Sequence, residues 1–337
     1  MEVNSEKERN VNKLLSKNGL ELATGIKMPS DASSRRYERF VYYNRRAMLM
    51  DAPLEKESIK PFIAVAEYLL QNGFSAPKIY DQDIENGLLL IEDLQDNIYT
   101  ELLRYNKKNL KEEQLYIYAS DVLTKLKTLP LLNSLPKYSE ELLLKEALLL
   151  TEWYLPNVKD IKNVNELAVE YKDIWQELLT QKSMFAEVVV LRDYHADNLM
   201  WLPKRRGLKR VALLDFQDAV IGSPLYDLVS LLEDARRDLD PKIVEAVISH
   251  YIKKNNITNE QEFFAEYYRL AAQRNCKIVG IFARLALRDG KKRYLDYLPR
   301  VWRHLNNDLK YPALAKLKNW FEKALPLDKQ ALENFKG

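Results

Sequence analysis

The stretch that decides the fold reads VVVLRDYHADNLMWLPKRRGLKRVALLDF and spans residues 188–216. Its apolar runs VVVL (188–191), LMWL (199–202) and RVALLDF (210–216) predict three short buried strands. The turn PKRRGLK joins the last two into a predicted hairpin, and we interpret its charge as a solvated tip. An Asp, a His and an Asn share the polar loop between the first two runs, in a chain with only three histidines. This concentration of reactive groups predicts a functional loop.

Three side chains of this stretch suit phosphoryl transfer to a hydroxyl. That reaction needs a carboxylate to orient the hydroxyl and accept its proton, and Mg²⁺ ions held by Asn and Asp oxygens. Asp193 supplies the first group, and Asn198 and Asp215 supply the ligands. A hairpin brings Asn198 and Asp215 to the same end of adjacent strands. The three residues therefore form a candidate catalytic constellation.

The spacing of Asp193 and Asn198 is not evidence in itself, because the intervals 81–86 and 160–165 repeat it. Only the Asp193 copy lies between apolar runs, follows an arginine and precedes LLDF. The alternative is a polar turn whose Asp and Asn satisfy backbone groups. The whole constellation favours the chemical interpretation.

The rest of the chain divides into an α+β part and a mostly helical part. Before residue 94 we predict a helix at 4–18, strands within 21–51, a helix at 57–73 and two strands around Asn86-Gly87. Helices predicted from apolar periodicity beyond that point span residues 110–129, 138–153, 164–183, 224–234, 241–254, 260–288 and 310–325.

LRDYHADNLMW and LLDFQDAVIGSPLYDLVSLL resemble the aminoglycoside phosphotransferase family, relatives of choline kinases with a protein-kinase-like fold. SDASSRRYERF, GFSAPKIYDQDIENGLLLIEDL and RNCKIVGIFARLALRDGKKRYLDYLPRVW are similar to one branch of it. That branch contains bacterial kinases that phosphorylate N-acetylmuramate and N-acetylglucosamine at the anomeric carbon 1. The resemblance implies ATP and Mg²⁺ as cofactors. It also implies a bilobal fold, with a small β-rich nucleotide-binding N-lobe at 1–93 and a larger, mainly helical C-lobe at 94–337.

Carried over by position, the resemblance makes Asp193 the catalytic base and Asn198 and Asp215 the Mg²⁺ ligands. His195 occupies the loop position where protein kinases keep a lysine near the γ-phosphate, and capping of a backbone carbonyl is an alternative role. Structural support of the loop falls to two further residues, Arg192 and Asp227.

The nucleotide phosphates need a different cradle from the common ones. G-x-x-x-x-G-K-[ST] is absent and the chain has nine glycines, which excludes a Walker-type ATPase. SDASSRR stands in place of a glycine-rich loop, where backbone N–H groups with the Ser33 and Ser34 hydroxyls can hold phosphate oxygens. Arg35 and Arg36 can add charge-assisted bonds. A plain hairpin turn is the alternative.

GLLLIEDL is predicted to be the last strand before the hinge. Backbone groups from Glu92 to Leu94 are then expected to meet the adenine edge, and the choice between adenine and guanine stays open. Two positions depart from the kinase pattern. Met50 stands where the third strand normally carries a lysine, so the charge must come from Arg35, Arg36 or Lys56. Leu191 replaces the first residue of the usual H-[RG]-D triplet.

The acceptor site is expected in the helical part. Glu146 with Trp153 and Tyr154 combines a carboxylate with aromatic platforms that suit sugar rings, whereas the leucines around them are assigned to packing. A further helix repeats basic residues at helical spacing, which describes either a positive stripe favouring an acidic acceptor or a solvated face. These residues are Arg274, Lys277, Arg284 and Arg288.

Composition narrows the remaining functions. The net charge of +3 is spread along the chain, which argues against nucleic acid as a partner. No run reaches the ~18 apolar residues of a membrane span, and the charged N-terminus lacks a signal-peptide core, so we expect a cytoplasmic protein. The single Cys276 excludes an internal disulfide and is expected to be buried.

These residues predict an ATP-dependent phosphotransferase for a small-molecule hydroxyl, and the resemblance favours a cell-wall amino sugar in peptidoglycan recycling. No obligate protein partner is inferred. The alternatives are another acceptor, such as an aminoglycoside or a choline-like alcohol, and a pseudokinase that binds nucleotide without chemistry.

Overall fold

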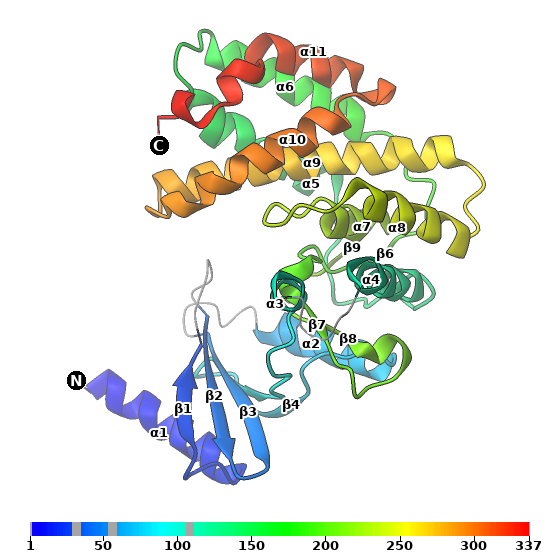
Figure 1. Cartoon of the computed structure of the whole chain (residues 1–337). Helices are drawn as coiled ribbons and strands as arrows, with labels where there is room; N and C mark the ends of the chain where they lie inside the picture. The colour runs from blue at the N-terminus through cyan, green and yellow to red at the C-terminus, as the bar shows by residue number, and fades with distance from the viewer. Residues whose placement is uncertain (1, 29–34, 53–58, 106–110, 337) are drawn as a thin grey trace. The chain divides into compact units, whose positions relative to one another are not determined.

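The computed structural model describes residues 2–28, 35–52, 59–105 and 111–336 (Figure 1). The predicted phosphate-loop serines Ser33 and Ser34, and Lys56, lie outside these residues. The chain forms two compact units. Unit 1 comprises 1–110, 129–135 and 191–219, and unit 2 comprises 111–128, 136–190 and 220–337. The loop of Asp193 is thus grouped with the amino-terminal sheet, and a lobe boundary at residue 93 stays a prediction.

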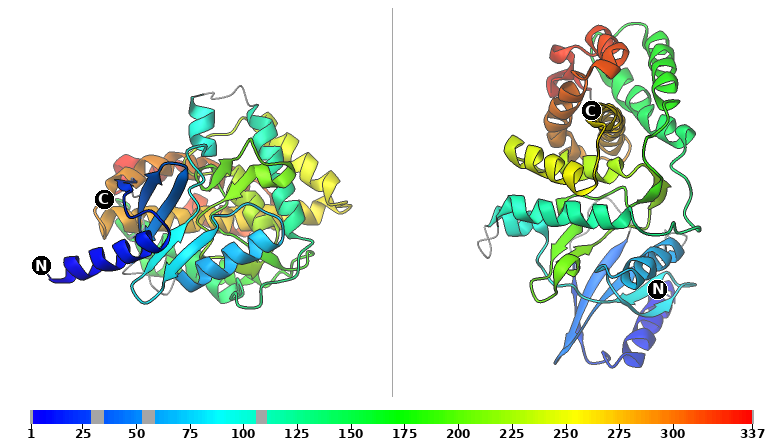
Figure 2. Two further views of the ribbon diagram at one scale, coloured as in Figure 1. Left: turned by 90° about the horizontal axis from the view of Figure 1, so that it is seen from below. Right: turned by 90° about the vertical axis from the view of Figure 1, so that its right-hand side faces the viewer.

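A five-stranded antiparallel sheet, in the order β1-β2-β3-β5-β4, forms the frame of unit 1. The side chains of Phe40, Leu49 and Leu90 on one face pack with Leu14 and Leu15 of the first helix. Figure 2 shows this helix beside the sheet. The elements of unit 1 are α1 (Glu2–Lys17), β1 (Thr24–Lys27), β2 (Arg36–Tyr42), β3 (Arg45–Asp51), α2 (Ile59–Gln71), β4 (Ile79–Asp83), β5 (Leu88–Ile91), α3 (Tyr99–Arg104), η5 (Ala196–Asn198), β7 (Leu199–Trp201) and β8 (Val211–Leu213).

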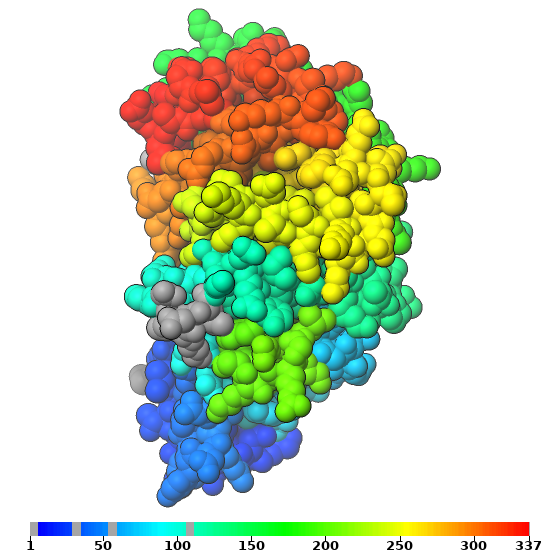
Figure 3. Space-filling view, turned by 45° about the vertical axis from the view of Figure 1, so that its right-hand side comes forward, coloured from blue at the N-terminus to red at the C-terminus, as the bar shows by residue number. Residues whose placement is uncertain are grey.

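The predicted hairpin of the deciding stretch is confirmed. β7 and β8 pair antiparallel with Leu199 opposite Leu213. Lys204 and Arg206 of the basic turn between them are exposed, as expected for a solvated tip, whereas Arg205 pairs with Glu92. The stretch of chain that contains this turn lies on the face drawn in Figure 3. At the other end, the N–H of Leu214 donates to the carbonyl of Asn198 at 3.0 Å. Asn198 and Asp215 therefore lie at the same end of adjacent strands, as the sequence predicts.

Unit 2 is mainly helical and is built around one long helix, α9. Trp175, Trp302 and Trp320 belong to its main hydrophobic core, and Cys276 is fully buried there as expected. The elements of unit 2 are α4 (Glu112–Leu126), α5 (Glu140–Ala147), the π-helix η3 (Leu150–Tyr154), α6 (Val164–Leu179), β6 (Val188–Val190), β9 (Val220–Gly222), α7 (Leu225–Leu232), α8 (Pro241–Lys254), α9 (Glu260–Leu287), α10 (Leu298–Asp308) and α11 (Ala315–Ala324), with β6 paired to β9.

Gly280 lets α9 pass close to the chain between α5 and η3. A Cβ atom at this position would lie 2.2 Å from the carbonyl carbon of Leu149, and backbone cannot yield as a flexible side chain does. The π-helix η3 begins at the next residue along the chain, Leu150. Its wider turn is uncommon outside sites with a special packing or functional demand. The absence of a side chain at Gly280 therefore sets how closely these helices pack.

The α+β fold class is confirmed, with a β-sheet in the N-terminal region and a mostly helical remainder. Two helices escape prediction. α10 carries Leu298, Val301, Trp302 and Leu305 at helical spacing, a signal that the sequence contains and the prediction misses. α3 has only six residues, which is below the length at which periodicity can be read. Among the described residues no helix is both long and apolar enough to cross a bilayer.

Candidate functional site

The loop that leads to Asp193 is strained. The N–H of Asp193 donates to the carbonyl of Leu191 at 2.9 Å, and Arg192 between them has a φ of 69°. A three-residue turn with positive φ at a non-glycine residue is rare and costs of the order of 1–3 kcal/mol. The Arg192 guanidinium stabilises it by donating to the carbonyl of Asp218 at 3.3 Å. The strained turn and its hydrogen bonds fix the half-buried Asp193 just after the end of β6.

Asn198 is fixed by its amide nitrogen. Its Nδ2 donates to the carbonyl of Asp193 at 2.9 Å and lies 3.4 Å from Nε2 of the buried His195. The amide oxygen of Asn198 makes no hydrogen bond within the described part of the chain. The five-residue spacing thus lets the Asn198 side chain bond back to the Asp193 backbone, beside His195. This bond leaves the uncharged amide oxygen of Asn198 as a possible metal ligand.

Asp215 carries the second strained backbone, with a φ of 55°. Its Oδ1 accepts hydrogen bonds from Arg35 at 3.3 Å and from Nε2 of Gln217 at 3.1 Å. The Arg35 side chain is only 7% exposed, whereas that of Asp215 is 42% exposed. A buried cation of the sheet therefore reaches a carboxylate 180 residues later in the chain.

Opposing influences act on the ionisation of Asp215. Burial raises its pKa above the ordinary value, and the negative charge of Asp193 raises it further. Arg35, the Gln217 amide and His195 oppose this rise. Two acidic groups brought this close favour a bound cation, because a cation relieves the repulsion between them.

Hydrophobic and hydroxyl contacts hold the loop from the amino-terminal side. Phe216 stacks on Phe62 of α2 with ring centroids 4.9 Å apart. The Thr100 hydroxyl of α3 donates to Asp197 at 2.5 Å, and the N–H of Trp201 donates to the carbonyl of Asn97 at 2.8 Å. The loop is thus tied to the segment that directly follows the expected hinge.

The expected hinge is itself anchored. The N–H of Glu92 donates to the carbonyl of Lys78 at 2.7 Å, and its carboxylate accepts from Arg205 at 2.6 Å. The Arg39 guanidinium of β2 pairs with the buried Asp93 at 3.0 Å. Leu94 is buried against Met200 and Ala212. The stretch from Glu92 to Leu94 is therefore held on both sides.

The structure separates the candidates for the missing strand lysine. Met50 is fully buried, and its Sδ accepts from the Tyr37 hydroxyl at 3.4 Å, so no cation can stand there. Arg36 is exposed at the start of β2, whereas Arg35 is buried beside Asp215. Of the two arginines, Arg35 is the one placed in the constellation.

The predicted acceptor residues lie in unit 2 and behave differently from one another. Glu146 is buried, pairs with Lys277 at 3.0 Å and accepts from the Tyr138 hydroxyl. Trp153 is half-buried against the core. Tyr154 is fully buried and stacks on Phe335 at 5.0 Å, so its ring is part of the core and is not a platform for a sugar.

The basic residues of α9 do not form one exposed stripe. Arg274 is buried and donates to the carbonyl of Glu233, and Lys277 is taken up by Glu146. Only Arg288 is exposed, where it pairs with Asp289 at 2.7 Å. Asp227, expected to support the loop, is buried in α7 of unit 2.

A second cluster of carboxyl groups lies inside unit 2. Asn275 donates to Glu233 at 2.7 Å and to Asp308 at 2.9 Å, and all three are buried. Burial raises the pKa of Glu233 to about 7 and that of Asp308 well above its usual range, so the pair retains a proton. The neighbouring His304 is held neutral, because burial lowers its pKa to about 4.

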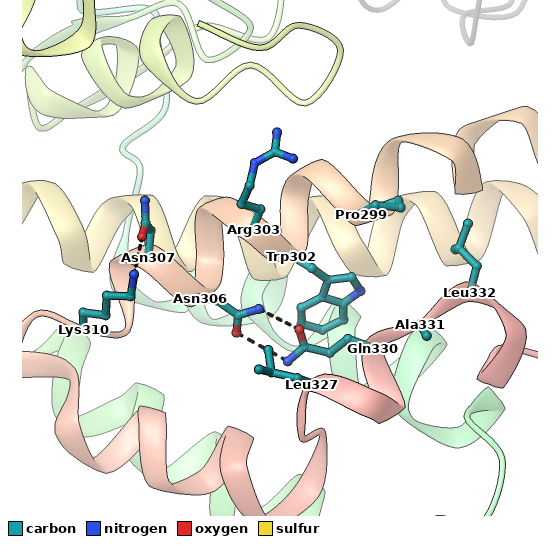
Figure 4. Close-up of a pocket in the computed structure, with 10 residues that line it drawn as sticks. All are labelled: Pro299, Trp302, Arg303, Asn306, Asn307, Lys310, Leu327, Gln330, Ala331 and Leu332. Atoms are coloured by element: carbon teal, nitrogen blue, oxygen red, sulfur yellow. Dashed lines mark hydrogen bonds between the residues drawn. The ribbon is translucent and has the colours of Figure 1, made fainter. Parts of the chain in front are cut away.

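Two cavities of unit 2 hold none of the residues predicted for catalysis. One of about 560 Å³ is lined in part by Glu233, His304 and Asp308. Another of about 420 Å³ lies beside α10 (Figure 4), where the Asn306 and Gln330 amides pair with each other over Trp302. The Asn306 and Gln330 amides of this second cavity thus satisfy each other, whereas the buried indole nitrogen of Trp302 has no hydrogen-bond partner among the described residues.

The residues of unit 1 fit a divalent cation by their chemistry. Mg²⁺ prefers carboxylate and carbonyl oxygens. Asp215 and Asn198 each present one such oxygen with no protein hydrogen bond among the described residues. Among the described residues, no three His, Cys, Asp or Glu side chains are grouped so that they could hold a metal ion. Binding of the cation therefore depends on the Asn198 amide oxygen and on oxygens of a bound substrate.

Comparison with known proteins places this geometry in a family. Residues 24–267 match the model of the phosphotransferase enzyme family. The chain belongs to this family. An N-acetylmuramate/N-acetylglucosamine kinase from Caulobacter vibrioides is 34% identical, with 97% of this chain and 99% of that protein covered. A kinase of the same name from Pseudomonas aeruginosa is also 34% identical, with 87% and 86% covered.

Solved structures of other proteins share the fold of this chain. The choline kinase LicA from Streptococcus pneumoniae aligns with a TM-score of 0.65 at 14% identity, over 91% of this chain and all of that one. The GDP complex of aminoglycoside 2'-phosphotransferase-IIIa aligns with a TM-score of 0.62 at 12% identity, over 93% and 99%. The predicted family and kinase-like fold are confirmed.

Sequence reasoning missed Gln217 and the Thr100–Asp197 contact. The signal for Gln217 was present in the run DFQD, where a neutral amide stands between two acids. Nothing in the sequence signals the Thr100 contact, because the two residues are 97 positions apart.

Proposed function

We propose that this phosphotransferase uses ATP and Mg²⁺ to phosphorylate the anomeric hydroxyl of N-acetylmuramate or N-acetylglucosamine, as part of peptidoglycan recycling. The observation that carries the chemistry is the meeting of Asp193, Asn198, Asp215 and Arg35 in one compact unit. The choice of acceptor is supported by the names of four relatives, which are 31–34% identical over most of the chain.

In this proposal Asp193 orients the sugar hydroxyl and accepts its proton as the phosphoryl group is transferred. An anomeric hydroxyl is more acidic than an ordinary alcohol, so one carboxylate suffices as the base. Asn198 and Asp215 would hold Mg²⁺, which supplies neutralisation of the phosphate charge. Most of the catalysis is then positioning and electrostatic stabilisation.

Arg35 takes the place of the strand lysine toward the nucleotide phosphates. Arg36, Ser33 and Ser34 remain proposed phosphate contacts from the sequence, and the two serines lie outside the described residues. Its burial next to Asp215 supports this role, because a guanidinium forms strong bonds with phosphate oxygens. At the hinge the N–H of Glu92 is already bonded to Lys78, so we assign the adenine contact to the backbone at Leu94.

Glu146 and Trp153 remain the proposed acceptor contacts. The buried ion pair of Glu146 with Lys277 supports this assignment for Glu146, because neither side chain can turn away without losing its partner. The Glu146 carboxylate therefore has a fixed position for a contact with the acceptor. Tyr154 is left out because its ring is enclosed in the core.

The test is ATP consumption with Mg²⁺ on N-acetylmuramate, N-acetylglucosamine, choline and an aminoglycoside, with Asp193→Ala as the control. Rapid, Asp193-dependent turnover on an amino sugar, giving an alkali-stable but acid-labile phosphate, would establish the anomeric kinase. Turnover on choline or the aminoglycoside alone would establish another acceptor. Nucleotide binding with no turnover on these acceptors would call for a wider acceptor search, and silence without ATP binding would favour the pseudokinase.

A further inference from the structure

Gln217 is a buried amide between two acids. Its side chain is only 5% exposed, and its Nε2 donates to Asp215 at 3.1 Å and to Asp218 at 3.2 Å. The amide can adopt only this orientation, because a reversed amide would set its oxygen against two carboxylates. Its Oε1 has no hydrogen-bond partner in the described part of the chain. The side chain therefore acts through its nitrogen.

The two donors to Asp215 converge on the same oxygen. Arg35 and Gln217 both bond Oδ1, and Oδ2 accepts no hydrogen bond among the described residues. A carboxylate held at one oxygen cannot rotate freely, so its second oxygen has a fixed direction. Hard cations such as Mg²⁺ demand near-ideal geometry and gain from such a fixed ligand.

We propose that Gln217 is a positioning residue for the phosphotransfer site, which holds Asp215 so that its Oδ2 alone is presented to a nucleotide-bound divalent cation. Asp218 is its support, because it accepts the second N–H and so fixes the orientation of the amide. This inference rests on the proposed function, in which Asp215 is a cation ligand.

The two hydrogen bonds to Oδ1 of Asp215, from Arg35 and Gln217, form a clamp on this carboxylate. We expect the two bonds to respond differently when a nucleotide binds. Arg35 is also assigned to the phosphates, so its bond to Asp215 is open to exchange. Gln217 is neutral and both N–H groups of its amide are already bonded to Asp215 and Asp218, so we expect its bond to Asp215 to persist. A glutamate at this position would lose the N–H donors and add a third negative charge between Asp215 and Asp218.

The test measures Mn²⁺ affinity of the full chain by electron paramagnetic resonance at a fixed concentration of a non-hydrolysable ATP analogue. Gln217→Met keeps the length of the side chain and removes its donors. We expect Mn²⁺ to bind about tenfold more weakly, the range for one lost hydrogen bond to a charged group. The affinity for the metal-free analogue should change less than twofold. Gln82→Met, an exposed glutamine of the same unit, is the matched control and should match the wild type.

Two further variants separate positioning from other roles. Asp218→Asn should weaken Mn²⁺ about threefold on its own and add nothing in the Gln217→Met background, because both act through one amide. Gln217→Glu should not restore affinity. Tighter Mn²⁺ binding by Gln217→Glu would overturn the proposal, since it would make this residue a direct ligand. Equal Mn²⁺ affinity of Gln217→Met and wild type, with only a lower Tm, would also overturn it.

The proposed function can fail separately. If the wild type turns over no acceptor, the Mn²⁺ titrations still decide the role of Gln217, because they involve no chemistry. If Asp215→Asn leaves Mn²⁺ affinity unchanged, the cation site itself is absent and the clamp is refuted with it.

Discussion

Two clusters of carboxyl groups, one in each compact unit, use their oxygens in opposite ways. In unit 1, Asp215 is half-exposed, and one of its oxygens is bonded while the other is open. In unit 2, Glu233 and Asp308 are buried together around the amide of Asn275. Each cluster pairs acids with an amide donor, and the first difference between the ligand site and the structural junction is the accessibility of the carboxyl oxygens.

The difference also lies in charge compensation. Asp215 has the buried Arg35 beside it, whereas the acids of unit 2 are kept partly neutral by a retained proton. A site that must receive a cation needs its carboxylates charged, and an enclosed junction is more stable when they are not. We therefore expect substitutions in the first cluster to change activity and those in the second to change stability.

The largest effect is expected for Asp193→Ala. Loss of the general base should lower kcat by about a thousandfold, within the range for acid–base catalysis. Nucleotide affinity and Tm should be close to those of the wild type, because Asp193 is half-buried and its backbone bonds remain. Steady-state kinetics, nucleotide titration and thermal unfolding check the three statements. Undiminished kcat would remove Asp193 from the mechanism.

Asn275→Ala should lower stability and leave kcat nearly unchanged, the reverse of Asp193→Ala. It leaves two buried carboxyl groups without their shared donor, which should lower the free energy of unfolding by about 2–4 kcal/mol. Denaturant unfolding measures this loss, and kcat at 15 °C should stay within a few-fold of the wild type. A thousandfold loss of kcat with unchanged unfolding would show that this cluster belongs to the active site.

Arg35→Met should weaken ATP binding about tenfold, since a charge-assisted bond to phosphate is lost. The exposed neighbour Arg36→Met provides the matched control and is expected to cost about twofold at most. Isothermal titration with Mg²⁺·ATP compares the two. A larger loss at Arg36 would transfer the role of the strand lysine to that residue.

The smallest effect concerns pH. The pKa of Glu233 is raised to about 7 in the folded chain, so between about pH 4.5 and 7 the folded state binds a proton that the unfolded state releases. This contribution to stability is complete at the acidic end and is lost as pH rises through 7. From pH 5 to 8 this shift is worth about 2–3 kcal/mol, so Tm should fall by a few degrees, and Glu233→Gln should flatten that decline. An identical pH profile in both proteins would assign the change to other groups.

Sequence patterns predicted the elements of this chain better than its contacts. Alternation and hairpin logic placed Asn198 and Asp215 together because only a short turn separates their strands. The bond from Arg35 to Asp215 spans 180 residues and depends on how α2, the sheet and the hairpin pack. Tyr154 was predicted as a platform because an aromatic residue looks the same in the core and at a surface. Such roles depend on tertiary burial, which periodicity does not contain.

The close packing at Gly280 predicts that this position tolerates almost no substitution, which a genetic selection can measure. Because the backbone of Leu149 occupies the space of a Cβ, every one of the nineteen other residues would force α9 away from its neighbours. A library randomised at this codon, and selected for growth that depends on the kinase activity, should return glycine almost alone. Gly73 has nothing within 4 Å of a Cβ position but has a φ of +85°, so its codon should return glycine together with asparagine and aspartate, the residues that best tolerate positive φ. The frequency of glycine at the two codons would then report, from sequencing alone, how closely the helices of unit 2 must pack.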